Sequence, residues 1–148
     1  MLKYDDCGLR NTWLSNGFQY INVEGVGKCL EIKNLPALHS AIAHNLVKYK
    51  KRLSGAEIRF LRVEMGLSQK SLGDLVGVDE QTVSLWERSA RKPALSAERV
   101  MRLLYLEHAD GKTKVADMIK KLNDTDRMAA DVSKHVYEAT RTGWKAAA

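Results

Sequence analysis

The sequence predicts a mainly α-helical protein that begins with a small antiparallel β element. Apolar residues recur at spacings of three and four through most of residues 36–122, which is the period of an amphipathic helix. Serine, aspartate and glycine interrupt this pattern where capping residues would start and end helices. Residues 1–34 instead hold short runs of β-forming residues separated by glycines, which is typical of hairpins.

The N-terminal segment contains two clear strand candidates. FQYINV at 18–23 and KCLEI at 28–32 alternate branched or aromatic residues with polar ones, and EGVG between them is a turn signal. Trp13 and Leu14 are expected to open a third strand, with SNG at 15–17 as its turn. Because a sheet of two or three strands is too small to be stable alone, we expect it to pack on the helices.

The first helix is expected from about 36 to 52. Pro36 suits the first turn of a helix, and the inward side is expected to hold Leu38, Ile42, Leu46 and Tyr49. The densest basic run of the chain, KYKKR at 48–52, falls in its last turn and suits the helix dipole. This run is either a solvated helix end or a contact to nucleic-acid phosphates, and the sequence leaves both open for Lys48, Lys50, Lys51 and Arg52.

Three short helices with clear caps follow. Ser54 and Glu57 form an S-x-x-E capping box, so a helix is expected from 55 up to Gly66. Ser68 caps the next helix, which Gly77 ends, and Asp79 caps the third. The buried side chains of the three are expected to be Ile58, Phe60, Leu61, Met65, Leu72, Leu75, Val76, Val83 and Trp86.

The C-terminal part is expected to hold two more helices and a tail. Ser96 is expected to cap the first of them, with Val100, Leu103, Leu104 and Leu106 inward; the second, at about 113–122, has Val115, Met118, Ile119 and Leu122 on one side. A weak pattern of Val132, Val136 and Ala139 suggests a terminal helix in the tail. We therefore divide the chain into an N-terminal subdomain at 1–52, a helical domain at 53–123 and a tail at 124–148.

Composition narrows the function classes. The 148 residues carry a net charge of +6, which mildly favours a polyanionic partner. No apolar run reaches the roughly 18 residues of a membrane span, and the N-terminus lacks the apolar core of a signal peptide. We therefore expect no membrane partner and a cytoplasmic location. Cys7 and Cys29 form no CxxC pair, so neither a disulfide framework nor a zinc site is expected.

No enzyme is expected, and no cofactor or metal. The chain contains no nucleophile elbow, phosphate loop or carboxylate constellation. His39 and His44 are five residues apart, which is not the i, i+4 spacing of a helical metal pair.

Residues 66–87, GLSQKSLGDLVGVDEQTVSLWE, combine G-L-S-Q, L-x-x-L-V-G-V, T-V-S and W-E in one register. This stretch resembles the helix-turn-helix family named for the Xre and Cro repressors, within a five-helix unit spanning about 54–123. The resemblance implies a sequence-specific DNA-binding domain whose helix at 80–88 enters the major groove. Gly73 stands where the family usually has alanine, and Ser89 and Ala90 stand where it commonly has glycine.

The resemblance also assigns contacts on double-stranded DNA. The base-facing candidates are Glu80, Gln81, Ser84 and Leu85. Gln81 is the best of them because an amide can bond an adenine edge with two hydrogen bonds. Leu85 is limited to apolar contact, and Thr82 and Ser84 could reach a base or a phosphate. Glu80 either reads a cytosine amino group or only tips the helix N-terminus.

Phosphate contacts are expected on both sides of these bases. Ser68, Gln69 and Lys70 begin the helix that crosses the DNA backbone. Arg88, Arg91 and Lys92 follow the recognition helix and are expected to hold the backbone too. Arg62 and Glu87 look like the ion pair that this family keeps between its first and third helices.

These features predict a homodimeric regulator, with repression expected from family habit, bound to a palindromic operator in the nucleoid. Residues 99–122 and the N-terminal sheet are both candidates for the dimer surface. A weaker resemblance, carried by CGLRNTWLSNGF and LSGAEIRFLR, is to regulators near the MqsA-type antitoxins. Those proteins carry four zinc-binding cysteines, whereas this chain has two. The alternatives are therefore an antitoxin that holds a cognate toxin through its N-terminal part, and an interaction protein that no longer binds DNA.

Overall fold

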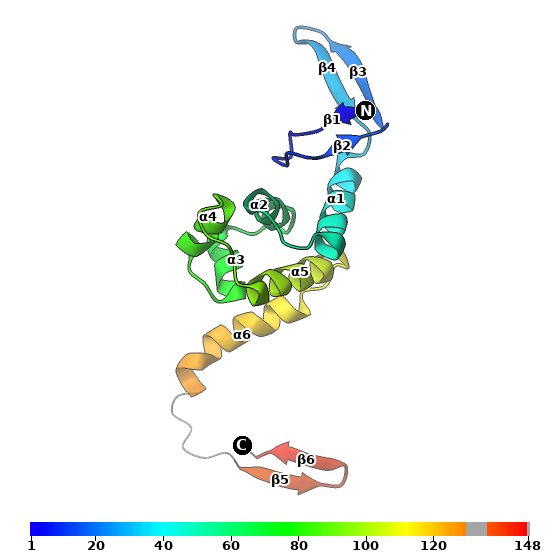
Figure 1. The fold of residues 1–148 in the computed structure, drawn as a ribbon. Coiled ribbons are helices and arrows are strands. Elements are labelled where there is room, and N and C mark those ends of the chain that lie inside the picture. Colours follow the sequence, from blue (N-terminus) through cyan, green and yellow to red (C-terminus); the bar gives the residue numbers. More distant parts are fainter. Residues whose placement is uncertain (130–135, 148) are drawn as a thin grey trace.

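The computed structural model describes residues 1–129 and 136–147, with side chains described outside residues 125–129. The described part is mainly helical, as predicted. It contains six helices and three separate pairs of antiparallel strands. Figure 1 shows the helices α1–α6 following one another through the middle of the molecule, with strand pairs toward both ends of the chain.

The predicted hairpin is present at the N-terminus. β3 (Phe18–Val23) pairs with β4 (Gly27–Ile32), with Phe18 opposite Ile32. The expected strand at Trp13–Leu14 exists as β2, but it pairs with β1 (Leu2–Lys3) and does not extend the hairpin. The expected single sheet is therefore two separate two-stranded ladders. The β3–β4 hairpin extends away from α2–α5 in Figure 1.

A hydrogen-bonded chain of side chains attaches the N-terminal strands to the helices. The buried Tyr4 bonds His39 Nε2 through its hydroxyl at 2.8 Å, and His39 Nδ1 lies 3.2 Å from Glu64 Oε1. The His39 ring also meets the edge of Phe60. The segment with β1 and β2 is thus held on α1 through Tyr4. The expected packing of the sheet on the helices is wrong for the β3–β4 hairpin, most of whose side chains are exposed.

α1 (Leu35–Tyr49) begins at Asn34, whose side chain accepts from the amide of Ala37, and ends three residues earlier than predicted. Its buried positions are Ala43, Leu46 and Val47. The assignment of Tyr49 to the inner face is wrong, because its side chain is 79% exposed. The other predicted positions agree with the structure, since Leu46 is buried and Leu38 and Ile42 are half-buried. α1 packs on both α2 and α5.

The three predicted caps after α1 are confirmed. α2 (Gly55–Glu64) has the full capping box of Ser54 and Glu57. Ser68 caps α3 (Gln69–Val76), and Asp79 caps α4 (Glu80–Glu87). Gly77 ends α3 at φ 83°, a left-handed conformation that glycine adopts without steric cost.

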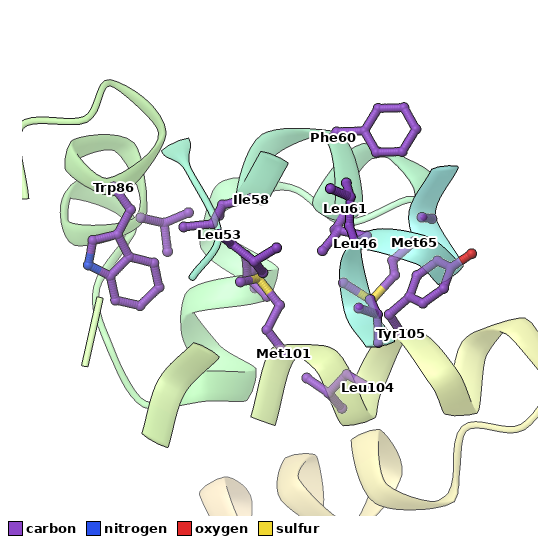
Figure 2. Packing of buried hydrophobic residues seen from close by; sticks show 14 of the residues in the cluster. Leu46, Leu53, Ile58, Phe60, Leu61, Met65, Trp86, Met101, Leu104 and Tyr105 are labelled. Carbon is purple, nitrogen blue, oxygen red and sulfur yellow. The ribbon is translucent and has the colours of Figure 1, made fainter. Parts of the chain in front are cut away.

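α5 (Leu95–Ala109) differs from the prediction at its start and on its face. Ala94, and not Ser96, is its N-cap, without a side-chain hydrogen bond. Leu103 is 62% exposed, so its inward assignment is wrong, while Met101 and Tyr105 are buried beside Leu104. Figure 2 shows these three side chains of α5 in the same cluster as residues of α1, α2 and α4.

The C-terminal part also departs from expectation. α6 (Lys114–Ala129) is longer than the predicted 113–122, and its residues Val115, Met118 and Leu122 are exposed. The weak pattern read as a terminal helix is wrong over its second half, where β5 (Tyr137–Thr140) pairs with β6 (Gly143–Ala146). Val132 lies outside the described residues.

A buried carboxylate joins α1 to α5. Glu98 is fully buried and accepts hydrogen bonds from Arg52 Nε at 2.9 Å, the Leu53 amide at 2.9 Å and Arg102 Nη2 at 2.8 Å. Arg102 also donates to the carbonyls of Leu46, Val47 and Lys50 at the end of α1, where carbonyls lack partners within the helix. Burial raises the pKa of Glu98, but these hydrogen bonds outweigh it and hold the pKa below its usual value.

Candidate nucleic-acid interface

α4 has a buried side and an exposed edge, which is the form that a groove-entering helix requires. Val83 is completely buried and Trp86 is 3% exposed, so both anchor the helix in the core. Glu80 and Gln81 are exposed, whereas Thr82, Ser84 and Leu85 are half-buried. The predicted readers therefore lie outside the core, and Gln81 is the one whose amide stands free in solvent.

The start of α4 is fixed by an ionised cap. The Thr82 amide donates to Asp79 Oδ1 at 2.7 Å. Hydrogen bonds from the side chain and amide of Thr82 hold the pKa of Asp79 below its usual value. The cap is therefore negatively charged at neutral pH, where it complements the helix dipole.

At the start of α3, the backbone offers more to a phosphate than the side chains do. The Ser68 hydroxyl accepts from the Ser71 amide and donates to the Ser71 hydroxyl, so its donor already has a partner. The half-buried Gln69 side chain donates to Glu87 Oε1 at 3.4 Å. The exposed groups that remain are the first amides of the helix and the Lys70 side chain.

The predicted ion pair is present and joins three elements. Arg62 Nε donates to Glu87 Oε2 at 2.7 Å and Arg62 Nη2 to Glu87 Oε1 at 2.9 Å, a bidentate arrangement. Arg62 Nη1 also donates to the carbonyl of Leu67 in the α2–α3 loop. Both side chains are largely buried, at 13% and 5% exposed. The pair therefore fixes α4 relative to α2 and the start of α3.

Two close backbone approaches set the path of the chain around α4. A Cβ on Gly73 would lie 2.6 Å from the Val78 carbonyl oxygen, in the turn that leads into α4. A Cβ on Gly55 would lie 2.4 Å from the Trp86 carbonyl oxygen, at the end of α4. The resemblance to the family drew attention to Gly73. Gly55 could not be identified in this way, because a small residue directly after a helix cap is common and does not by itself indicate a close contact.

The basic residues after α4 lie on the surface. Arg88, Arg91 and Lys92 are exposed. Ser89 has φ 60°, so it adopts the left-handed conformation for which the family commonly uses glycine. The turn after α4 therefore keeps its left-handed residue, although that residue is Ser89 and not the glycine that is common in the family.

Two of the four cations in the basic run at 48–52 form ion pairs within the protein. Arg52 pairs with Glu98, and Lys50 Nζ lies 3.5 Å from Glu57 Oε2. Lys48 and Lys51 are exposed. These ion pairs favour the helix-end interpretation for Lys50 and Arg52, and both interpretations stay open for Lys48 and Lys51.

Other kinds of site can be assessed for the described residues alone. There, no group of three or more histidine, cysteine or acidic side chains is placed to hold a metal ion. Cys7 and Cys29 are free and half-buried. Within those same residues, none of the helices combines the length and apolarity needed to cross a membrane.

Comparison with known families agrees with this geometry. A helix-turn-helix family model matches residues 58–104, which include most of α2, all of α3 and α4, and the first part of α5. Searches of curated proteins and of solved structures give no match. Residues 58–104 are therefore a helix-turn-helix domain of the Xre/Cro type, the DNA-binding domain of transcription regulators.

Proposed function

We propose that this chain is a sequence-specific repressor that places α4 in the major groove of its operator. The observation that carries the proposal is the exposed edge of α4, with Gln81 free in solvent and Val83 buried behind it. Polar side chains on a rigid helix can read base edges, because their positions are set by the core. The half-buried Ser84 and Leu85 then contribute contacts at the rim of that edge.

Phosphate contacts on both sides complete the proposed interface. The open amides at the start of α3 and the Lys70 side chain would hold one strand of the backbone. Arg88, Arg91 and Lys92 would hold the backbone beyond α4. Each phosphate contact is expected to steepen the salt dependence of binding by about 0.9 in log–log slope.

We propose that the active form is a homodimer on a palindromic operator. α5 and α6 expose the apolar side chains of Leu103, Val115, Met118 and Leu122, and a second copy would remove such side chains from water. A two-fold symmetric dimer would place two copies of α4 about one helical turn of DNA apart, on the order of 34 Å.

The decisive experiment is selection of bound sequences from a random DNA pool, followed by affinity measurements with Gln81→Ala. A groove reader should lose about 1–3 kcal/mol of binding free energy and its preference at one base pair. Asp74→Ala, on the exposed side of α3, is the matched control and should leave the preference unchanged. No enriched sequence for the wild-type chain would refute the proposal and favour an interaction protein that does not bind DNA.

An antitoxin that also represses its own operon is the second candidate. The β3–β4 hairpin supports it, because Tyr20, Ile21, Val23 and Leu30 are all at least 37% exposed on a two-stranded element. A hairpin of this size is seldom stable without a partner surface. Co-expression with the product of the neighbouring gene tests this role: rescue of growth that depends on residues 18–32 would support it, and absence of any complex would exclude it.

A further inference from the structure

An open groove lies beside the end of α4, next to the DNA surface assigned above, with which it shares Arg88. It has a volume of about 900 Å³ and is lined by residues 9–13, by α1, by the start of α2 and by the end of α4. Three cations from three different parts of the chain border it: Arg10, Lys50 and Arg88. The groove is therefore lined by both the N-terminal subdomain and the helix-turn-helix domain.

The acidic residues in the groove wall are already neutralised. Glu87 is held by Arg62 in the bidentate pair. Glu57 is occupied by the Ser54 amide and by Lys50. Within the described part of the chain, Arg10 and Arg88 form no ion pair. The groove thus presents two unpaired guanidinium groups, which is the chemistry that recognises phosphate.

The loop that carries Arg10 is held in place on both sides. Leu9 and Leu14 are 6% and 8% exposed, so they anchor the loop in the protein. The Tyr4 amide donates to the Thr12 carbonyl at 2.8 Å, and Trp13 Nε1 donates to Asn11 Oδ1 at 3.4 Å. Arg10 itself is exposed. Because the backbone of this loop is already ordered, binding a ligand at Arg10 costs little backbone conformational entropy.

We propose that this groove extends the DNA interface, with Arg10 binding a backbone phosphate beyond the bases that α4 reads. The inference rests on the proposed function, because it takes Arg88 at the end of α4 to lie on the same duplex. Arg88 borders both the recognition helix and the groove, so a backbone that leaves α4 at Arg88 next meets the loop 9–13. Phosphate contact supplies affinity without sequence information.

The test compares Arg10→Gln with wild type in the full chain, using the selected operator at salt concentrations from 50 to 200 mM. Loss of one phosphate contact should reduce the log–log salt slope by about 0.9, so the affinity ratio of the two proteins changes by about 3.5-fold over this range. The base preference should not change. Arg10→Lys should retain the slope, since a phosphate contact requires charge more than fork geometry.

Arg141→Gln is the matched control, because Arg141 is an exposed cation in the turn between β5 and β6, outside the proposed DNA and dimer surfaces. It should leave the slope at the wild-type value. Thermal unfolding of each variant checks that the fold is intact, which is expected because Arg10 is exposed. Hydroxyl-radical footprinting gives an independent measure: Arg10→Gln should lose protection only at the edge of the protected region.

The outcomes separate this inference from the function on which it rests. If wild type selects no sequence and shows no salt-dependent binding, the proposed function fails first. If Arg88→Gln lowers the slope and Arg10→Gln does not, α4 binds DNA but the groove does not, and the inference is overturned. Affinity for poly-glutamate is measured in parallel. If Arg10→Gln lowers that affinity and leaves the salt slope of DNA binding unchanged, the groove binds an acidic protein and the inference is also overturned.

Discussion

Gly73→Ala tests whether the close approach of α3 to the following turn positions α4, the proposed recognition helix. Alanine is favoured over glycine inside a helix by about 0.8–1 kcal/mol, and the resembled family usually has alanine here. In this structure, however, the added Cβ would lie 2.6 Å from the Val78 carbonyl oxygen and 3.3 Å from backbone atoms of Asp79. Backbone atoms cannot rotate away as a flexible side chain can, so the turn itself must move.

Overpacking of a well-packed site typically costs about 1–3 kcal/mol. Subtracting the gain in helix propensity of about 0.8–1 kcal/mol leaves a net loss of about 0–2 kcal/mol in the free energy of unfolding for Gly73→Ala. The displaced atoms belong to Val78 and to Asp79, the cap of α4. Operator affinity should therefore fall as well, even under conditions where the variant is fully folded.

Urea denaturation of the variant and of Asp74→Ala measures the first effect. Asp74 is an exposed neighbour on the same helix. Its replacement by alanine therefore measures the effect of higher helix propensity in α3 without the clash against the Val78 carbonyl. Operator affinity at low temperature, where both proteins are folded, measures the second. A Gly73→Ala protein as stable as wild type, with unchanged affinity, would refute the claim that this contact controls the position of α4.

Two further predictions concern stability. Ser89→Gly should stabilise the fold by about 0.5–1 kcal/mol in urea denaturation, because the left-handed conformation at φ 60° costs serine more than it costs glycine; a destabilised variant would contradict the assigned strain. Glu98→Gln should cost about 3 kcal/mol at pH 7, since it removes a buried charge partner of Arg52 and Arg102. The pKa of Glu98 is lowered in the folded state, so its contribution is complete above about pH 4.5 and is lost as the pH falls through the lower folded value. Thermal unfolding of the variant should accordingly depend less steeply on pH below 4.5, and an unchanged dependence would show that Glu98 is not the group responsible.

The helix starts within the motif could be predicted because their signals are local. A cap needs only one side-chain oxygen and an amide three residues later, as at Ser54, Ser68 and Asp79. The buried positions of short helices were also predictable, because one face of two turns leaves few choices. Val83 and Trp86 are examples. The predicted positions of the DNA readers rest on the same pattern, and their roles stay predictions.

Which face of the longer helices is buried could not be predicted in the same way. Tyr49 and Leu103 have apolar neighbours at helical spacing, but the direction of burial depends on where α1 and α5 meet. Burial of Glu98 is another such case, because Arg52, which pairs with it, is 46 residues away in sequence. The pairing of β2 with β1 could not be predicted either, because it depends on the conformation of the loop that connects the two strands.

The C-terminal hairpin could have been predicted from its local sequence. The β-forming residues Tyr137, Thr140 and Trp144 lie on either side of Gly143, which has a positive φ and begins β6. The spacing of Val132, Val136 and Ala139 was given more weight than that signal, although three residues can fit a helical period by chance.

The Glu98 cluster and the proposed groove depend on each other physically. Arg52 and Arg102 bind Glu98 and the end of α1, which fixes α1 on α5. Tyr4 and His39 then fix the N-terminal strands on α1. The position of Arg10 relative to α4 is therefore set in part by contacts at the end of α1, where Leu46 and Lys50 also line the groove. Loosening Glu98 should weaken the contribution of Arg10 to the salt slope, whereas base preference, which depends on the Arg62 pair, should persist.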